Sequence, residues 1–191
     1  MVHRRKLLIT GTAGLLGSAG LGLDGLQWVH AQTTLPAEVA QALPGAQQAG
    51  SARLRVFGFN VYDATLWVEP GFSAATFEQH ALVLELTYLR RLSGDAIAQR
   101  SLQEIARLGR INPGQSQRWL AAMLASFPDV RSGDRLTGLH RPASGAGFWL
   151  NGQPRPGIED PEFSRLFFGI WLSQATSEPE LRRALLARYT P

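Results

Sequence analysis

Arg55 and Tyr62 are the two side chains whose types and spacing best suit the binding of an anion. They lie in Ala52 to Glu69, a stretch of strand-forming residues interrupted by Gly58-Phe59. A glycine in the first position of a two-residue loop favours a type II′ hairpin turn, which would place Arg55 directly opposite Tyr62. An arginine fork and a phenol hydroxyl on a covered face of a sheet could together hold a carboxylate. The alternative interpretation is a cross-strand pair that only stabilises the sheet.

A second arginine, Arg53, falls on the same strand face as Arg55 and Tyr62 because side chains alternate along a strand. The opposite face, which includes Leu54 and Val56, is apolar. Because neither face is fully polar, we expect both to be at least partly covered. Arg53 is therefore a secondary candidate for ligand binding, and a solvated or structural role is the alternative.

The remaining composition excludes several kinds of site. The chain has no cysteine, which rules out disulfides, a thiol nucleophile and Cys-ligated metals. His80 and His140 have no second ligand at metal-binding spacing. Glu159-Asp160 precedes a predicted helix, where the helix dipole is the simplest explanation for two carboxylates. Since no glycine-rich phosphate loop is present either, the sequence predicts neither a metal nor a cofactor.

Residues 1–31 are typical of an export signal. A basic start, His3 to Lys6, precedes an apolar run rich in glycine, and a small residue, Ala31, ends the segment. The Arg4-Arg5 pair favours the twin-arginine route, with Sec export or an uncleaved anchor as alternatives. We therefore predict a periplasmic or secreted protein without a stable membrane span after cleavage.

Removal of that signal would leave 16 basic and 14 acidic residues, a balance too mild to indicate nucleic-acid binding. The segment 32–50 is rich in Ala, Gln and Pro and is predicted to be a lead-in with one short strand or turn. The folded domain is then expected over residues 51–191, which is long enough to bury a core of its own.

Beyond the hairpin, hydrophobic periodicity and turn residues predict strands followed by pairs of helices. The expected elements are a strand over 81–89, a helix capped by Ser93 that runs to Leu108, a helix over 116–127, strands over 135–140 and 147–150, a turn at Asn151-Gly152, a helix from Asp160-Pro161, and a last helix over 181–188 with a Ser177/Glu180 capping box. This order indicates an α+β domain on an antiparallel sheet. The apolar stripe of the helix after Asp160 is expected to form core, or in part to line a cleft, and comprises Phe163, Phe167, Ile170 and Trp171.

Four blocks of the chain together resemble the chalcone isomerase superfamily, most closely its exported bacterial members. They are Gly50 to Arg55, Asn60 to Glu69, Gly94 to Leu108 and Asn151 to Leu172, in that order. The resemblance covers nearly all of the chain after residue 31. It implies an open-faced β-sandwich with a large antiparallel sheet, packed with helices that form a ligand cleft.

The resemblance also implies where functional residues would lie. The arginine of the plant enzymes falls on Arg55, with Arg53 as the fallback, and their threonine falls on Tyr62, where fatty-acid-binding members also carry tyrosine. Their tyrosine and asparagine fall on Ile97 and Glu104, so two polar groups of the isomerase are missing.

A serine or threonine of the late helix block corresponds to Ser164. The resemblance implies a non-catalytic binder of a small amphipathic carboxylate such as a fatty acid, gripped by Arg55 and Tyr62. The alternatives are an intramolecular lyase of the chalcone isomerase type, an isomerase that would use the same two residues, and a ligand-free structural periplasmic protein. An ionised Glu104 near the ligand would oppose an anion unless it pairs with an arginine.

Overall fold

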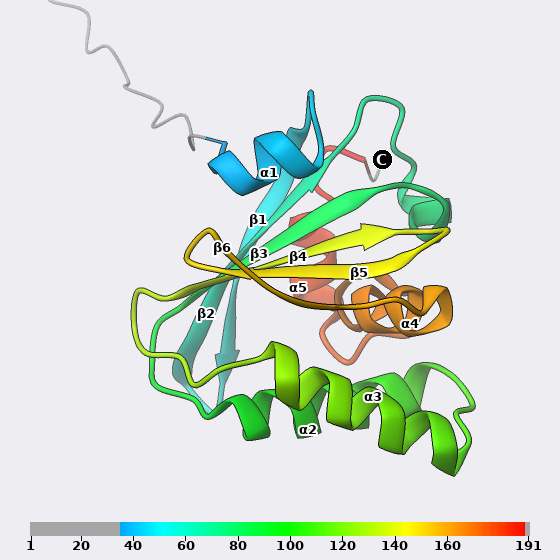
Figure 1. Cartoon of the computed structure of the whole chain (residues 1–191). Coiled ribbons are helices and arrows are strands. Elements are labelled where there is room, and N and C mark those ends of the chain that lie inside the picture. Colours follow the sequence, from blue (N-terminus) through cyan, green and yellow to red (C-terminus); the bar gives the residue numbers. More distant parts are fainter. Residues whose placement is uncertain (1–34, 190–191) are drawn as a thin grey trace, which may run out of the picture. The chain divides into compact units, whose positions relative to one another are not determined.

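Six antiparallel strands that follow one another in chain order build the sheet on which the site depends (Figure 1). The computed structural model describes residues 35–189, so the predicted export signal, residues 1–31, lies outside the described residues. Every strand pairs with its sequence neighbour, which confirms the predicted antiparallel α+β architecture. The strands are β1 (Gln47–Val56), β2 (Phe59–Val68), β3 (Leu82–Tyr88), β4 (Arg135–Arg141), β5 (Gly145–Leu150) and β6 (Gln153–Ile158).

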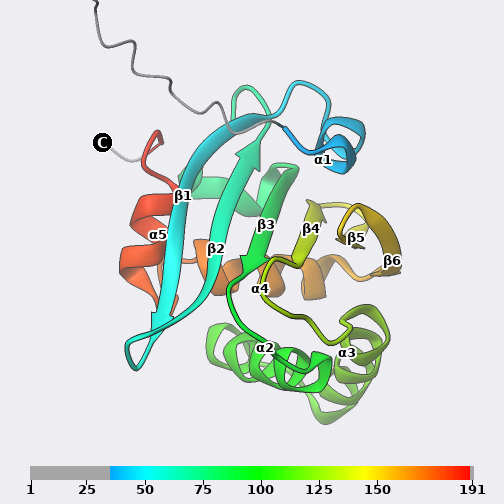
Figure 2. The same ribbon diagram turned by 90° about the vertical axis from the view of Figure 1, so that its left-hand side faces the viewer.

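The helices cover the two faces of the sheet unequally. Figures 1 and 2 both show α2 and α3 side by side below the sheet, with α4 above them. These helices and α5 share one large apolar core with the sheet, whereas α1 packs a small cluster, including Val39, Trp67 and Leu139, on the other face. The helices are α1 (Ala37–Ala42), the 3₁₀ segment η1 (Ala74–Gln79), α2 (Gly94–Leu108), α3 (Pro113–Ser126), α4 (Pro161–Leu172) and α5 (Pro179–Leu185). No helix in the described range 35–189 is long and apolar enough to cross a membrane.

The turn of the β1–β2 hairpin differs from the predicted one. Phe57 and Gly58 both have positive φ, 49° and 79°, so they are the two central residues of a type I′-like turn that pairs Val56 with Phe59. The type I′ conformation suits the right-handed twist of the strands and uses glycine in the second position rather than the first. A turn at Gly58-Phe59, as expected from the sequence, would have paired Val56 with Val61, so the predicted turn is wrong.

A β-bulge at Val61 then shifts the register again. Arg55 pairs with Asn60, and Leu54 pairs with Tyr62. The predicted pairing of Arg55 with Tyr62 is wrong, and because side chains alternate, the two lie on opposite faces of the sheet.

The strand β6 was not predicted because its sequence contains Pro154 and Pro156, which lack the N–H group that a central strand needs. At the edge of the sheet that loss is tolerated, since one side of the strand has no neighbour. Segment 32–50, for which one short strand or turn was expected, contains α1 and the first residues of β1.

Two helix starts also differ from the expected ones. Helix α3 begins at Pro113 rather than at the expected residue 116, because Asn112 and Gln115 form a reciprocal capping box. Helix α5 has no side-chain cap, and Ser177 instead donates a hydrogen bond to Glu104, so the predicted Ser177/Glu180 capping box is wrong. The expected Ser93 cap of α2 and its end at Leu108 are confirmed.

Close packing of α5 on β1 leads to a stability prediction at Gly50. A Cβ atom there would lie 2.2 Å from the carbonyl oxygen of Ala184 and 2.6 Å from that of Leu185. We expect Gly50→Ala to lower the free energy of unfolding by about 1–3 kcal/mol, because backbone rather than a flexible side chain must move. Urea denaturation checks this, with the exposed neighbour Ser51→Ala as the matched control, expected within about 0.5 kcal/mol of wild type. Equal stability of the two variants would contradict the packing.

Candidate functional site

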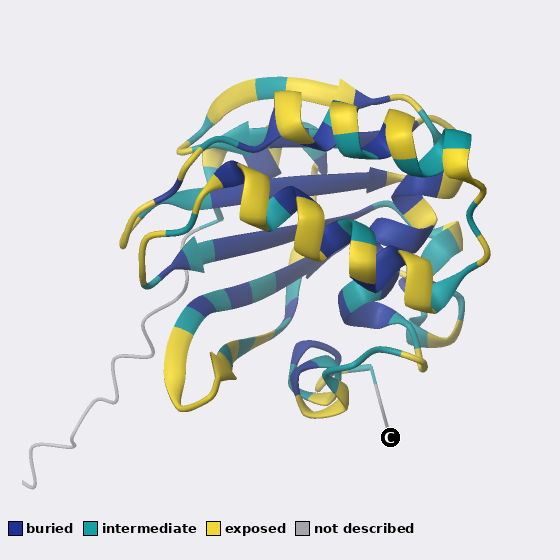
Figure 3. Ribbon diagram, turned by 90° about the horizontal axis from the view of Figure 1, so that it is seen from below, coloured by how far each residue is buried: buried dark blue, intermediate teal, exposed yellow. Residues whose placement is uncertain are grey.

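A cavity of about 500 Å³ lies between the helix-covered face of the sheet and the helices α2 and α4. Its volume is within the range of about 300–1,000 Å³ that is usual for small-molecule sites. In Figure 3, which looks from below, the strands behind the helices are largely buried, while the β1–β2 hairpin end at the lower left is exposed. The apolar side chains of the lining come from three parts of the fold: Leu54, Val56, Phe57, Val61, Leu86 and Leu136 from or beside the strands, Ile97 from α2, and Phe167, Ile170 and Trp171 from α4.

Two buried tyrosines give this apolar cavity its polar groups. Tyr62 is 9% exposed and Tyr88 is 2% exposed, and their rings meet edge to face with centroids 6.0 Å apart. The indole N–H of Trp171 donates to the Tyr62 hydroxyl oxygen over 2.9 Å. Within the described residues, neither tyrosine hydroxyl hydrogen has an acceptor, and the Tyr88 oxygen has no hydrogen-bond partner.

The protonation state of both phenols follows from their burial. Desolvation raises the pKa of Tyr62 and of Tyr88 well above the usual value near 10, because the charged phenolate would lose its hydration. Both groups therefore stay neutral at physiological pH and keep their hydroxyl hydrogens. The cavity thus offers two hydrogen-bond donors for which the described residues supply no acceptor.

Glu104 lies at the polar edge of the cavity, and neighbouring arginines balance its negative charge. Its carboxylate is 5% exposed and lies 2.5 Å from Arg100 and 3.9 Å from Arg107, and it accepts a hydrogen bond from Ser177 over 3.0 Å. Arg100 and Arg107 are the charge partners here, not the strand arginines. Because the carboxylate is ion-paired, it repels an anionic ligand less strongly. The sequence had left open whether Glu104 would oppose such a ligand or pair with an arginine, and the structure shows the pairing.

Arg55 and Arg53, the two arginines predicted to grip the ligand, are not brought to the cavity. Arg55 donates to the side-chain oxygen of Asn60 over 3.0 Å, and Arg53 forms a two-pronged exposed pair with Asp63 at 2.6 and 2.8 Å. Neither arginine lines the cavity, whereas Tyr62 does. The predicted Arg55–Tyr62 clamp is therefore wrong, because the hairpin register places the arginines on the opposite sheet face.

The cations that do line the cavity are Arg90 and Arg100. Sequence reasoning missed both. Arg100 could have been found from its position on α2, three residues after the cavity-lining Ile97 and four before Glu104, since residues at these spacings share a helix face. Arg90 follows the end of β3 and has no comparable signal in the sequence.

Ser164, the residue that the family resemblance picks out in the late helix block, lies outside the cavity. It is fully buried, donates to the backbone carbonyl of Gly145 over 2.9 Å and lies 2.6 Å from Nδ1 of His140. His140 is itself inaccessible, so this pair joins α4 to the sheet. No cluster of metal-ligating side chains occurs among the residues that the structure describes.

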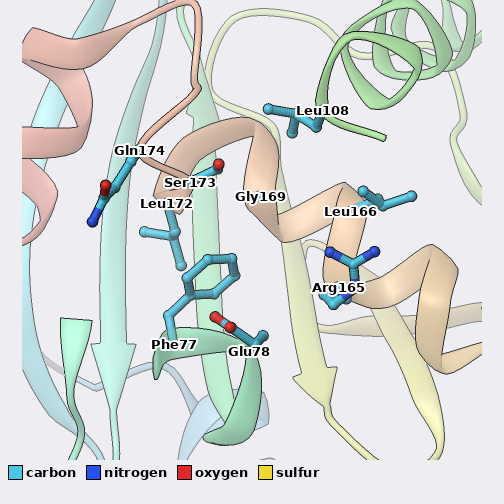
Figure 4. Close-up of a pocket in the computed structure, with 9 residues that line it drawn as sticks. All are labelled: Phe77, Glu78, Leu108, Arg165, Leu166, Gly169, Leu172, Ser173 and Gln174. Carbon is cyan, nitrogen blue, oxygen red and sulfur yellow. The ribbon is translucent and has the colours of Figure 1, made fainter. Parts of the chain in front are cut away.

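A smaller pocket of about 210 Å³ occupies the opposite side of α4 (Figure 4). Phe77 and Glu78 face Arg165, Gly169 and other α4 residues across it. It is below the usual size of a small-molecule site. The larger cavity is therefore the candidate site.

The two cavity tyrosines should differ in their contribution to stability. We expect Tyr62→Phe to lower the free energy of unfolding by about 1–3 kcal/mol, because it leaves the buried Trp171 N–H without its acceptor. Tyr88→Phe removes a hydroxyl with no partner in the described part of the chain and should be neutral or stabilising. Urea denaturation of both variants checks this, and a large loss for Tyr88→Phe would reveal a partner for its hydroxyl.

Comparison with known proteins agrees with the architecture. A family model described as chalcone isomerase-like matches residues 47–187. An uncharacterized protein of Haemophilus influenzae is 31% identical over 144 residues, which cover 74% of this chain and 68% of that protein. The crystal structure of an Arabidopsis thaliana fatty-acid binding protein, AtFAP1, superposes with a TM-score of 0.60 over 76% of this chain and 89% of that chain, at 10% identity. This likeness confirms the predicted fold of an antiparallel sheet packed with helices.

Proposed function

The chain belongs to the chalcone isomerase-like family, and from this premise we propose that it is a non-catalytic binder of a small amphipathic carboxylate such as a fatty acid. The observation that carries the proposal is the pair of neutral tyrosine hydroxyls inside an apolar cavity of about 500 Å³, for which residues 35–189 provide no acceptor. The Arabidopsis protein with the same fold is described as fatty-acid binding, which supports the same class of ligand.

The head of such a ligand would accept hydrogen bonds from Tyr62 and Tyr88. A carboxylate is the strongest common acceptor, and each hydrogen bond to a charged group contributes about 1.5–3 kcal/mol. Arg100 lines the cavity and adds positive charge near the Tyr62 hydroxyl, where Glu178 and Glu104 contribute negative charge. A guanidinium carries five N–H donors, so Arg100 can keep its ion pair with Glu104 and still donate to a ligand.

The tail of the ligand would lie among the apolar side chains that line the cavity. Removal of apolar surface from water contributes about 25 cal/mol per Å², so a long alkyl chain gains most of its affinity there. The same lining argues against a ligand-free structural role, because an apolar cavity of this size loses packing interactions when it is empty.

The isomerase alternative has less support from the site. Ile97, at the position of the plant enzymes' tyrosine, is part of the apolar lining and cannot position a phenolate or a water. Glu104, at the position of their asparagine, is held in its ion pairs. The arginine aligned with theirs, Arg55, is on the other sheet face. These departures favour binding without chemistry.

We further propose that the protein acts after export, in the periplasm or outside the cell. The support is the sequence of residues 1–31, with its basic start, glycine-rich apolar run and small residue before Gln32.

The binding proposal is tested by titration with a fluorescent long-chain fatty acid. We expect Tyr88→Phe to weaken binding about tenfold or more, since it removes a donor without disturbing the fold. Arg55→Gln is the matched control and should bind like wild type, because Arg55 lies outside the cavity. A fatty alcohol of the same length should bind more weakly to the wild-type protein than the acid does.

A cavity-filling variant makes the test independent of the head group. Ile97→Trp should abolish binding of the same probe, because it places an indole in the space of the ligand tail. Unchanged affinity in both Ile97→Trp and Tyr88→Phe, with native circular dichroism, would refute this cavity as the site.

A further inference from the structure

The tip of the β1–β2 hairpin, residues 56–59, concentrates the exposed apolar side chains of the fold. Val56 is 40% exposed, Phe57 97% and Phe59 64%. The only other large apolar side chain with comparable exposure in the described range is Leu124, which stands alone on α3 at 44%. Single exposed apolar residues are ordinary, but three in one turn form a patch that requires an explanation.

Phe57 is also an unfavourable choice for its backbone position. Its φ of 49° lies in the left-handed region, where a type I′ turn strongly prefers asparagine, aspartate or glycine. A bulky side chain there is strained, and at 97% exposure it gains no packing energy in return. Neither the residue preference of the turn nor packing in the core explains a phenylalanine at this position. Its presence therefore points to a partner outside the chain.

Arginines accompany this apolar tip. The guanidinium of Arg90 lies 5.5 Å from the centre of the Phe59 ring, and Arg91 follows it in the chain. Arg55, next to the tip, donates only to Asn60. All three are exposed, and none forms an ion pair with another described residue. The tip therefore combines exposed aromatic side chains with positive charge that no carboxylate of the described chain neutralises.

We propose that this hairpin tip docks on the surface of a membrane that contains anionic lipids. Phe57 and Phe59 would enter the boundary between head groups and acyl chains, and the arginines would lie among the lipid phosphates, as in other interfacial segments. A second copy of this chain fits less well, because two tips brought together would set their arginines against each other.

The position of the tip connects this surface to the cavity. Val56, Phe57 and Arg90 belong to the tip region and also line the cavity. A docked tip would therefore place the cavity opening at the lipid surface, where an amphipathic ligand could pass between bilayer and protein without crossing water. The docking itself goes beyond the proposed ligand and does not require it.

The absence of cysteine allows a site-specific test in the full chain. Phe57→Cys and, as the matched control, Leu124→Cys are each labelled with the environment-sensitive fluorophore NBD and mixed with phosphatidylcholine vesicles that contain phosphatidylglycerol. We expect emission from position 57 to rise about twofold or more with a blue shift, because the label leaves water. Position 124 should not change. Because the signal is local, it does not depend on what residues 1–34 do.

Charge is tested separately with unlabelled protein in vesicle sedimentation. Arg90→Gln should weaken binding to the phosphatidylglycerol vesicles by about fivefold, the usual effect of one arginine near an anionic surface. Arg110→Gln, an exposed arginine at the far end of α2, is the control and should have no effect. Binding should also fall as salt is raised.

Three results would overturn the proposal. They are an unchanged signal at position 57 with anionic vesicles, an equal change at positions 57 and 124, and a change at position 57 that depends on protein concentration without vesicles, which would show self-association. The fatty-acid titration uses no vesicles, so failure of membrane docking leaves the proposed ligand intact, and loss of ligand binding leaves the vesicle results readable.

Discussion

The pairing of Leu54 with Tyr62 across the β1–β2 hairpin decides which side chains reach the cavity. Two local features produce it, the Phe57-Gly58 turn and the bulge at Val61. Together they turn Tyr62 toward the helices and leave Arg53 and Arg55 on the other face. Because strand side chains alternate, a change of one residue in either feature would exchange the two sets. The chemistry of the site therefore depends on the backbone conformation of the residues that precede Tyr62 in the hairpin.

The buried carboxylate at the edge of the cavity is compensated by its neighbours. Glu104 is buried, and its charge is balanced by two arginines of the same helix and a serine hydroxyl. Without these partners a buried carboxylate would favour its neutral form or draw in water. The indole N–H of Trp171 donates to the Tyr62 hydroxyl, and this hydrogen bond orients Tyr62. The indole has no other hydrogen-bond partner among the described residues. The two phenol hydrogens, which have no acceptor among the described residues, are therefore available to a ligand.

Two residues of the site region depart from the usual local rules. The Tyr88 hydroxyl has no hydrogen-bond partner among the described residues, and Phe57 is exposed in a strained conformation. By contrast, helices α2, α3 and α4 begin at side-chain caps, and the prolines of β6 lie at a sheet edge. Exceptions to otherwise consistent rules are most often connected with function. One of them lies inside the cavity and the other at its opening.

The sequence by itself determined the α+β class, the antiparallel sheet, the bounds of β3 and α2, and the family. These features depend on local periodicity, caps and motif order, which are written in consecutive residues. It also singled out Tyr62, which lines the cavity, but the arginines that it placed beside Tyr62 lie on the other face of the sheet. Only the tertiary structure decided that Arg90 and Arg100 replace Arg53 and Arg55 at the cavity, that β6 joins the sheet despite its prolines, and that Ser177 binds Glu104 rather than capping α5. The physical reason is that strand register and contacts between distant segments arise from the packing of the whole domain, and a turn type that differs by one residue reverses the face of every side chain in the strand.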